Sequence, residues 1–426
     1  MIDLGDLSRP NRVVTGRQPA ARRWRGLALG FAVTACLGTL HSAPTGEPTV
    51  RMAWTAPSTR TLLTQADRDT VWAHRAVDGG GELTAYELAT GHARWTRPTT
   101  PAAVSAGWFS VLPDAGIVLV PSENGNTVLD AMTGAPLWQS PGSTEAHTVG
   151  TVLLRESDVE GRSTGLRLVG ARDGRTIWQR PMGGIGGVQV RFGDGRPGVI
   201  AVDTGELLIL LRYDDGTPLI SRRLPDEAID ERYLSFAGDS VLVQFRAESA
   251  FAVTAFRLDT LAESWQAEQA GGGALDGCGP VVCLSGSKGI AGLDPVTGVQ
   301  RWALPADYGI WSVLGDRIVA SHSPRTSDEG RQPLVSVIDA QTGRRLGDEV
   351  PGQPAVSVIG DGRLLLLRPR PDDPVGAISV YDLDVATGRS KLIGEADYQL
   401  LNSAYELVGH HLTRLLDGQL QVMNVG

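Results

Sequence analysis

The side chains that could support metal or nucleophilic chemistry are few in this chain of 426 residues and form no recognisable group. Its seven histidines lack the spacing of metal ligands, and the adjacent His410 and His411 lie on a predicted strand, where neighbouring side chains point to opposite faces. No Gly-x-Ser-x-Gly nucleophile elbow, dinucleotide-binding turn or phosphate loop occurs. The sequence therefore predicts no catalytic residue and no metal site.

Cysteine chemistry is confined to one short segment and one isolated residue. Cys278 and Cys283 enclose Gly-Pro-Val-Val at a predicted hairpin, and Cys36 lies in an apolar stretch far from both. A zinc site needs four ligands, and no histidine or second cysteine pair is close in sequence. We predict a small disulfide between Cys278 and Cys283, as is common in oxidising compartments, with two free thiols as the alternative.

The aspartates recur too regularly to be unique catalysts. Asp130, Asp294 and Asp339 each begin the same phrase, which reads Asp-x-x-Thr-Gly-x-x-x-Trp in full at Asp294 to Trp302. A catalytic residue should break a repeat, because chemistry needs one site among near-equivalent copies. The repeated carboxylates are therefore interpreted as turn residues that hydrogen-bond the nearby backbone.

The phrase occurs eight times with a period of about 42 residues. The fourth copy has Ile220 where the Trp should be, and the fifth has Leu261 where the Gly should be. The turn glycines are Gly91, Gly134, Gly174, Gly216, Gly298, Gly343 and Gly388. The recurring tryptophans are Trp54, Trp95, Trp138, Trp178, Trp265 and Trp302, of which Trp54 has no Thr-Gly before it.

This period and these residue types are typical of a four-stranded propeller blade. Short alternating segments precede each turn, glycine supplies the positive φ of the turn, and the next strand carries an indole large enough to seal one sheet against its neighbour. Helix signals are almost absent after residue 45. We interpret the tryptophans as packing residues; stacking on a ligand is the alternative for a subset of them.

The phrase resembles the pyrroloquinoline-quinone-type repeat, and the resemblance covers roughly residues 50–426. It implies an eight-bladed, quinoprotein-like β-propeller, of a kind that serves quinoprotein alcohol dehydrogenases and also non-enzymatic relatives such as a lipoprotein subunit of the outer-membrane barrel assembly machinery. The dehydrogenases use calcium, a stacking Trp and often a disulfide of adjacent cysteines. The absence of adjacent cysteines and of long insertions favours the non-enzymatic, membrane-anchored branch without a cofactor.

The number of blades has two possible values. Val50 to Trp54 looks like an outer strand and Asp417 to Val425 like the strand before it, so pairing them would close the ring and remove a free edge. Eight phrases and this split blade make nine if counted literally. The family precedent is eight, and the prediction is an all-β, eight-bladed propeller after a single N-terminal transmembrane helix.

The N-terminal region divides into three predicted parts before a propeller at residues 50–426. Residues 1–23 form a cytoplasmic tail rich in Arg, residues 24–43 a transmembrane anchor and residues 44–49 a linker. Arginines just before an apolar segment fit the positive-inside rule, which places the propeller outside the cytoplasm. The alternatives are a lipoprotein acylated at Cys36 and a cleaved secretory signal.

The predicted function is a membrane-anchored extracytoplasmic scaffold for binding or assembly in a bacterial cell envelope. Its partners are the membrane, through residues 24–43, and an unidentified protein or envelope ligand. A net charge of −9 argues against nucleic acid, whose phosphates need a basic surface. The alternatives are a quinoprotein oxidoreductase using pyrroloquinoline quinone and calcium, and a sensor that signals through the N-terminal tail.

Overall fold

The computed structural model describes residues 50–57, 61–123, 125–158, 160–193, 196–225, 231–247, 250–270, 273–322, 332–354, 363–370, 376–402 and 405–425. All of these ranges belong to one compact unit that begins at Pro48. The predicted tail at 1–23, anchor at 24–43 and linker at 44–49 lie outside the described residues. No helix within the described ranges is long and apolar enough to cross a membrane.

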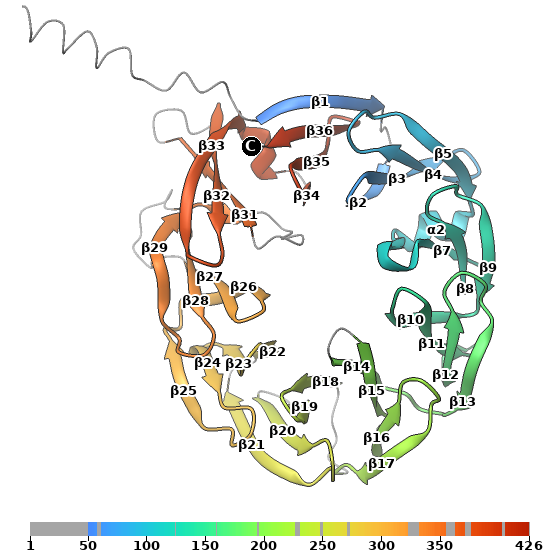
Figure 1. The fold of residues 1–426 in the computed structure, drawn as a ribbon, viewed down its shortest axis with the longest axis vertical. Coiled ribbons are helices and arrows are strands. Elements are labelled where there is room, and N and C mark those ends of the chain that lie inside the picture. Colours follow the sequence, from blue (N-terminus) through green and yellow to red (C-terminus); the bar gives the residue numbers. More distant parts are fainter. Residues whose placement is uncertain are drawn as a thin grey trace, which may run out of the picture. The chain divides into compact units, whose positions relative to one another are not determined.

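The compact unit is a ring of nine four-stranded antiparallel sheets (Figure 1), which we number as blades in chain order. Blade 1 combines strands from both ends of the chain: β1 (Val50–Pro57), β36 (Gln419–Val425), β35 (His411–Leu416) and β34 (Tyr405–Val408). Blade 2 contains β2 (Thr61–Asp67), β3 (Thr70–Val77), β4 (Gly80–Glu87) and β5 (Ala93–Thr99), and blade 3 contains β6 (Ser110–Leu112), β7 (Ile117–Ser122), β8 (Gly125–Asp130) and β9 (Pro136–Ser140). Blade 4 contains β10 (Gly142–His147), β11 (Thr151–Ser157), β12 (Ser163–Gly170) and β13 (Thr176–Pro181), and blade 5 contains β14 (Gly187–Gly193), β15 (Arg196–Asp203), β16 (Leu207–Arg212) and β17 (Pro218–Arg223).

Blades 6 to 9 complete the ring. Blade 6 contains β18 (Glu231–Ala237), β19 (Ser240–Ala247), β20 (Ala250–Arg257) and β21 (Glu263–Ala270), and blade 7 contains β22 (Gly273–Cys278), β23 (Val281–Gly286), β24 (Gly289–Leu293) and β25 (Gln300–Leu304). Blade 8 contains β26 (Tyr308–Leu314), β27 (Arg317–His322), β28 (Leu334–Asp339) and β29 (Arg345–Pro351), and blade 9 contains β30 (Gln353–Pro354), β31 (Arg363–Pro369), β32 (Ala377–Asp384) and β33 (Arg389–Asp397). In blades 6 to 8 the first strand lies toward the centre of the ring and the fourth lies at its rim (Figure 1).

Helical structure is limited to three short segments within the described residues. They are α2 (Pro101–Ala106), η1 (Pro113–Ala115) and η2 (Tyr398–Asn402). The Thr100 side chain accepts the Ala103 N–H at the start of α2, and Gly107 ends the helix with φ +67°. This helix contacts β4 and β7, so it covers the boundary between blades 2 and 3.

The core is distributed around the ring instead of being central. The described residues form nine clusters of buried apolar side chains, and each cluster lies at one of the nine boundaries between neighbouring blades, which we call seams. The seam between blades 1 and 2, for example, contains Val71, Val408 and Val422. Since each sheet is too thin to bury its own faces, every blade depends on its two neighbours for stability.

The expected count of eight blades is wrong. Strand β1 pairs with β36 from Val50 opposite Val425 to Pro57 opposite Gln419, and the resulting sheet is additional to the eight that carry the repeated phrase. The phrase is the turn between the third and fourth strands of a blade. In blade 1 these two strands come from opposite ends of the chain, so no turn joins them and no phrase marks the blade.

Candidate functional site

The recurring tryptophans seal the seams with one repeated contact. Each indole lies on the outermost strand of its blade, and its N–H donates to a backbone carbonyl in the phrase turn of the next blade. The six pairs are Trp54 with Leu88 (2.7 Å), Trp95 with Ala131 (3.0 Å), Trp138 with Ala171 (3.0 Å), Trp178 with Tyr213 (2.8 Å), Trp265 with Pro295 (3.0 Å) and Trp302 with Ala340 (2.8 Å).

The turn glycines lie directly against these rings. Gly134 has φ +66°, and a Cβ atom added there would be 2.6 Å from Cδ2 of Trp95. The position therefore needs glycine both for its backbone conformation and for its space. The same relation links five further pairs across the seams: Gly91 with Trp54, Gly174 with Trp138, Gly216 with Trp178, Gly298 with Trp265 and Gly343 with Trp302.

The repeated aspartates are engaged within the turns. Oδ1 of Asp294 accepts the backbone N–H groups of Val296 and Thr297, and its Oδ2 accepts Nη2 of Arg301 at 2.5 Å. The Arg301 hydrogen bond, followed by the bond from Thr297, holds the pKa of Asp294 at about 2. The carboxylate is thus permanently ionised in the physiological range and has a structural role.

Two seams lack this seal although both of their blades carry the phrase. At the seam between blades 8 and 9, Gly347 occupies the place of the indole, and a Cβ on Gly388 would be 2.0 Å from the Leu346 carbonyl oxygen. The two backbones therefore pack directly on each other. Gly388 keeps its turn conformation, with φ +69°, but has no indole beside it.

The seam between blades 5 and 6 departs from the repeat more extensively. Ile220 on β17 replaces the indole, and it packs in the same cluster as Leu261, which replaces the glycine and is 1% exposed. Leu261 keeps the left-handed turn with φ +48°. Nη1 of Arg222 donates to the Leu261 carbonyl at 2.8 Å, so a guanidinium also bonds across this seam, but to a carbonyl three residues beyond the one that the indoles bond in the other turns.

The inner end of this seam is open. Between blades 2 and 3, Gln65 on β2 spans to the next blade: its Nε2 donates to the Phe109 carbonyl at 2.9 Å and its Oε1 accepts the Val111 N–H at 2.8 Å. Following the strand pairing outward across blade 2, Gln65 leads through Trp72 and Ala85 to Trp95. The same path across blade 5 leads from Gln189 through Ala201 and Leu210 to Ile220. Gln189 on β14 therefore holds the place that Gln65 holds on β2. No hydrogen bond joins the Gln189 side chain to another described residue. A cleft of about 480 Å³ lies there.

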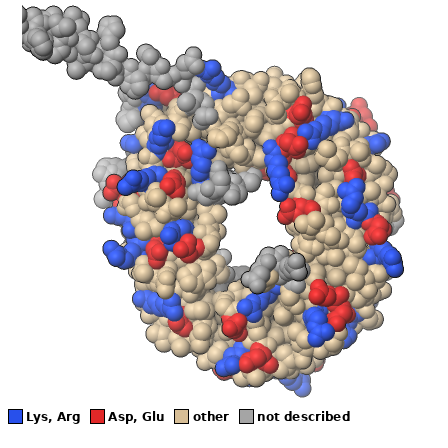
Figure 2. Space-filling model, viewed as in Figure 1, with Lys and Arg blue, Asp and Glu red and all other residues tan. Residues whose placement is uncertain are grey.

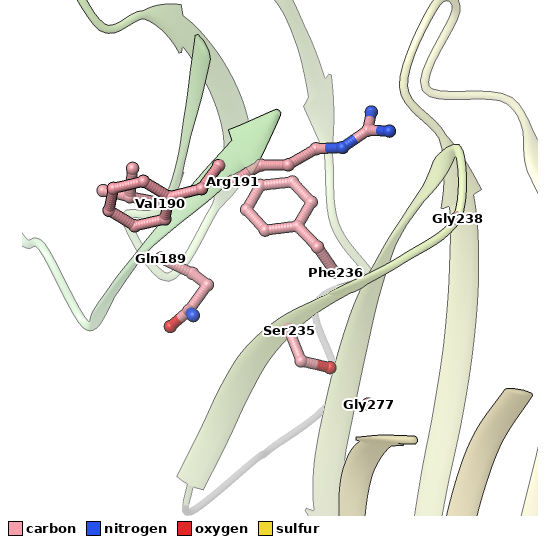
Figure 3. Close-up of a pocket in the computed structure, with 8 residues that line it drawn as sticks. Gln189, Val190, Arg191, Ser235, Phe236, Gly238 and Gly277 are labelled. Carbon is pink, nitrogen blue, oxygen red and sulfur yellow. The ribbon is translucent and has the colours of Figure 1, made fainter. Parts of the chain in front are cut away.

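The cleft presents groups suited to binding. Figure 3 shows Gln189 and Arg191 on β14 facing Ser235 and Phe236 on β18. Oγ of Ser235 is buried and has no hydrogen-bond partner, and Phe192, which also lines the cleft, is 49% exposed. Nη2 of Arg191 is 3.1 Å from Oδ1 of Asp239. The site thus offers an amide, a hydroxyl, a cation and aromatic faces.

Cys278, which directly follows the cleft-lining Gly277, forms a disulfide with Cys283. Their Cα atoms are 5.7 Å apart, and the bond links β22 to β23 across the hairpin. Both residues are buried in the cluster between blades 7 and 8.

A group of polar side chains in blade 8 was not predicted from sequence. The Tyr308 ring stacks on His322 at 4.4 Å, and its hydroxyl donates to Oε1 of Glu349 at 2.9 Å. Burial opposes ionisation of Glu349, but the Tyr308 hydrogen bond and Arg345 outweigh it and lower the pKa. No three His, Cys, Asp or Glu side chains in the described ranges lie close enough together to hold a metal ion.

Several known structures are similar to the chain at low sequence identity. A eukaryotic initiation factor matches 81% of this chain and 91% of its own at 11% identity, with a TM-score of 0.55. BamB from Moraxella catarrhalis matches 74% and 98% at 15% identity with a TM-score of 0.39, and a europium-containing methanol dehydrogenase matches 87% and 85% at 12% identity with a TM-score of 0.41. The likeness to the initiation factor concerns the fold alone.

The family comparison is more specific. No curated protein sequence matches the chain. A family model described as outer membrane protein assembly factor BamB matches residues 37–162 and 162–392, which is most of the chain. The repeated phrase, the blade-to-blade seals and this match agree, and the chain belongs to that family of propellers with pyrroloquinoline-quinone-like repeats.

Proposed function

We propose that the chain is an extracytoplasmic scaffold, tethered to a membrane through residues 24–43, that binds an envelope partner at the cleft between blades 5 and 6. The family supports a role in binding or assembly in general terms. The Arg-rich residues before the apolar segment and the Cys278–Cys283 disulfide support a location outside the cytoplasm. Acylation at Cys36 is the alternative form of the tether.

The observation that carries the proposal is the break in symmetry at this seam. A ring of near-equivalent blades gives a partner many similar surfaces, and specific recognition needs a place that differs from the others. The seam between blades 5 and 6 differs at the rim, through Ile220 and Leu261, and at the inner wall, through Gln189 and the exposed Phe192 ring. Aromatic and arginine side chains in a cleft are the groups that dominate protein interfaces.

The surface charge suggests no competing site on the face shown in Figure 2. Basic and acidic side chains are interspersed around the central opening there. Ion pairs occur within blades and also across neighbouring blades, as between Arg172 and Asp130. Such a mixed surface gives weak non-specific attraction, so the cleft supplies the contacts on which affinity depends.

Site-specific photo-crosslinking tests the proposal. A photoreactive residue replaces Phe192 in the full-length chain, expressed in the cells that naturally produce it; a matched chain carries the same residue at Ile177, which is 52% exposed on β13. We expect one discrete adduct from position 192 whose yield falls at least threefold with Arg191→Ala. Equal adducts from both positions, or an adduct from 192 insensitive to Arg191, would contradict binding at this cleft.

A thiol assay tests the location separately. Cells are quenched with acid, and the denatured chain is alkylated before and after reduction. We expect Cys278 and Cys283 to react only after reduction, because a cytoplasmic hairpin would be kept reduced. Immediate alkylation of both residues would place the propeller in the cytoplasm.

A further inference from the structure

The Gln65 contact shows what the inner edge of a blade requires. The Phe109 carbonyl and the Val111 N–H, two residues apart, both point away from β7 and toward blade 2, as alternate groups of an edge strand do. A side chain that spans them needs one donor and one acceptor. The primary amide of Gln65 has both.

Glu406 holds the same place in blade 1. In blade 2 the strand pairing leads outward from Gln65 through Trp72 and Ala85 to the sealing Trp95. In blade 1 it leads from Glu406 through Thr413 and Val422 to the sealing Trp54. Strands β34 and β2 lie side by side across the seam. The Ala66 N–H interacts with the Glu406 carboxyl and lowers its pKa, from the place at which the Val111 N–H donates to Gln65 in the next seam.

Gln65 also donates to a backbone carbonyl, and Glu406 can make the equivalent hydrogen bond only when its carboxyl group is protonated. The Thr64 carbonyl precedes Ala66 by two residues, as the Phe109 carbonyl precedes Val111. Oε2 of Glu406 is buried and has no hydrogen-bond partner. A carboxylate only accepts hydrogen bonds and cannot bond a carbonyl placed as the Phe109 carbonyl is; a carboxylic acid can donate to it through its O–H, as the Gln65 amide does through Nε2.

The surroundings favour the neutral form. Val71, Ala73 and Val408 form the apolar cluster of this seam. Burial raises the pKa of Glu406 to about 7, against the opposing effect of the Ala66 N–H. The ionisable side chains on the strands packed around it are Asp67, His74, Arg75, His411 and Arg414, and no ion pair joins any of these described groups to Glu406.

Two of these cations already have partners. Nε of Arg75 donates to Glu82 at 2.7 Å, and Nε of Arg414 donates to the Gln421 side chain at 2.7 Å. Glu82 neutralises Arg75, and Arg414 is paired with Tyr405, so its side chain lies on the face of the sheet opposite Glu406. Neither therefore provides the counter-charge that an ionised Glu406 would need.

We propose that Glu406 joins blades 1 and 2 as a neutral carboxylic acid equivalent to the Gln65 amide, so that its ionisation loosens the seam between these two blades. The folded chain holds this proton more tightly than the unfolded chain, in which a glutamate titrates near 4.5. The stabilisation is therefore complete below about pH 4.5 and is lost as the pH rises through about 7.

Hydrogen exchange of the full-length chain between pH 5 and 8.5, corrected for intrinsic rates, measures this seam directly. We expect protection of the β2 and β34 amides, Ala66 included, to fall by roughly 10- to 100-fold as Glu406 ionises. Glu406→Gln should remove that fall and keep protection high at pH 8. The reciprocal change Gln65→Glu should create a new fall in protection at Val111, in the seam between blades 2 and 3.

The outcomes separate a proton-dependent contact from simple packing. An unchanged pH profile in Glu406→Gln, or protection lost at every pH, overturns the proposal. If Glu406→Gln does not fold, Gln65→Glu decides: an unaltered profile at Val111 counts against the proposal. None of these readouts depends on the partner at the cleft between blades 5 and 6.

Discussion

A single tryptophan makes two contacts at once, and Trp138 shows how they combine. Its indole N–H donates to the Ala171 carbonyl of blade 4 at 3.0 Å, and its ring covers Gly174. Trp138→Ala removes both and leaves a void, so we expect the free energy of unfolding to fall by about 3–5 kcal/mol in denaturant titrations. Trp138→Phe keeps most of the ring and should cost only about 1–2 kcal/mol. Equal stability of Trp138→Ala and the parent would refute the sealing role.

At this scale the sequence predicts residue types better than residue partners. The phrase identified the turn glycines and the tryptophans, because positive φ and a large buried ring each need a particular side chain. It did not identify the contact of Gln65 with Phe109 and Val111, or the neutral state of Glu406. Nothing in the local sequence distinguishes these two residues from solvated polar side chains on a strand.

At the scale of the elements, two deviations from the repeat prove to be in contact with the same seam cluster. Ile220 and Leu261 are the missing Trp of one copy and the missing Gly of the next, and they face each other across one seam. Each was noted from sequence as an isolated deviation. Their relation was not apparent, because it depends on the outer strand of one blade packing against the turn of the following blade.

This pairing predicts strong coupling in a double-mutant cycle. Ile220→Trp alone forces an indole against the buried Leu261 side chain, and Leu261→Gly alone leaves a void beside Ile220; each should lower the free energy of unfolding by about 2–4 kcal/mol. Together they rebuild the Trp–Gly contact of the other seams and also remove a non-glycine residue at φ +48°. We expect a favourable coupling of about 1–3 kcal/mol in denaturant titrations. Additive effects would show that the two residues do not face each other.

At the scale of the whole molecule, the sequence-based number of blades was wrong because the blade that closes the ring was not counted. The period predicted a propeller, and the pairing of the two chain ends was anticipated from their strand-like sequences. The count followed family precedent, although eight phrases and one split blade make nine. The inner wall was least predictable, because the first strands of the blades differ in length, from two residues in β30 to seven in β14, and carry no common phrase.

Because the pairing of β1 with β36 closes the ring, the stability of the entire ring should depend on this pairing. Arg51 and Asn424 lie opposite each other in the β1–β36 pairing, and both are exposed. Replacing both with cysteine should allow a disulfide that encloses almost the whole propeller. On the chain-entropy model such a long loop adds on the order of 4–5 kcal/mol, because the unfolded chain loses freedom.

The expected result is a higher thermal unfolding midpoint for the cross-linked chain than for Arg51→Ser/Asn424→Ser. The pair Thr55→Cys/Asn424→Cys is out of register by four residues and should not form the bond, since paired cysteines need Cα atoms within about 7 Å of each other. Two outcomes would oppose a closed nine-bladed ring: efficient bonding of the out-of-register pair, and an in-register bond that leaves the midpoint unchanged. Because every seam depends on both of its blades, a firm closure should raise a single cooperative transition instead of splitting it.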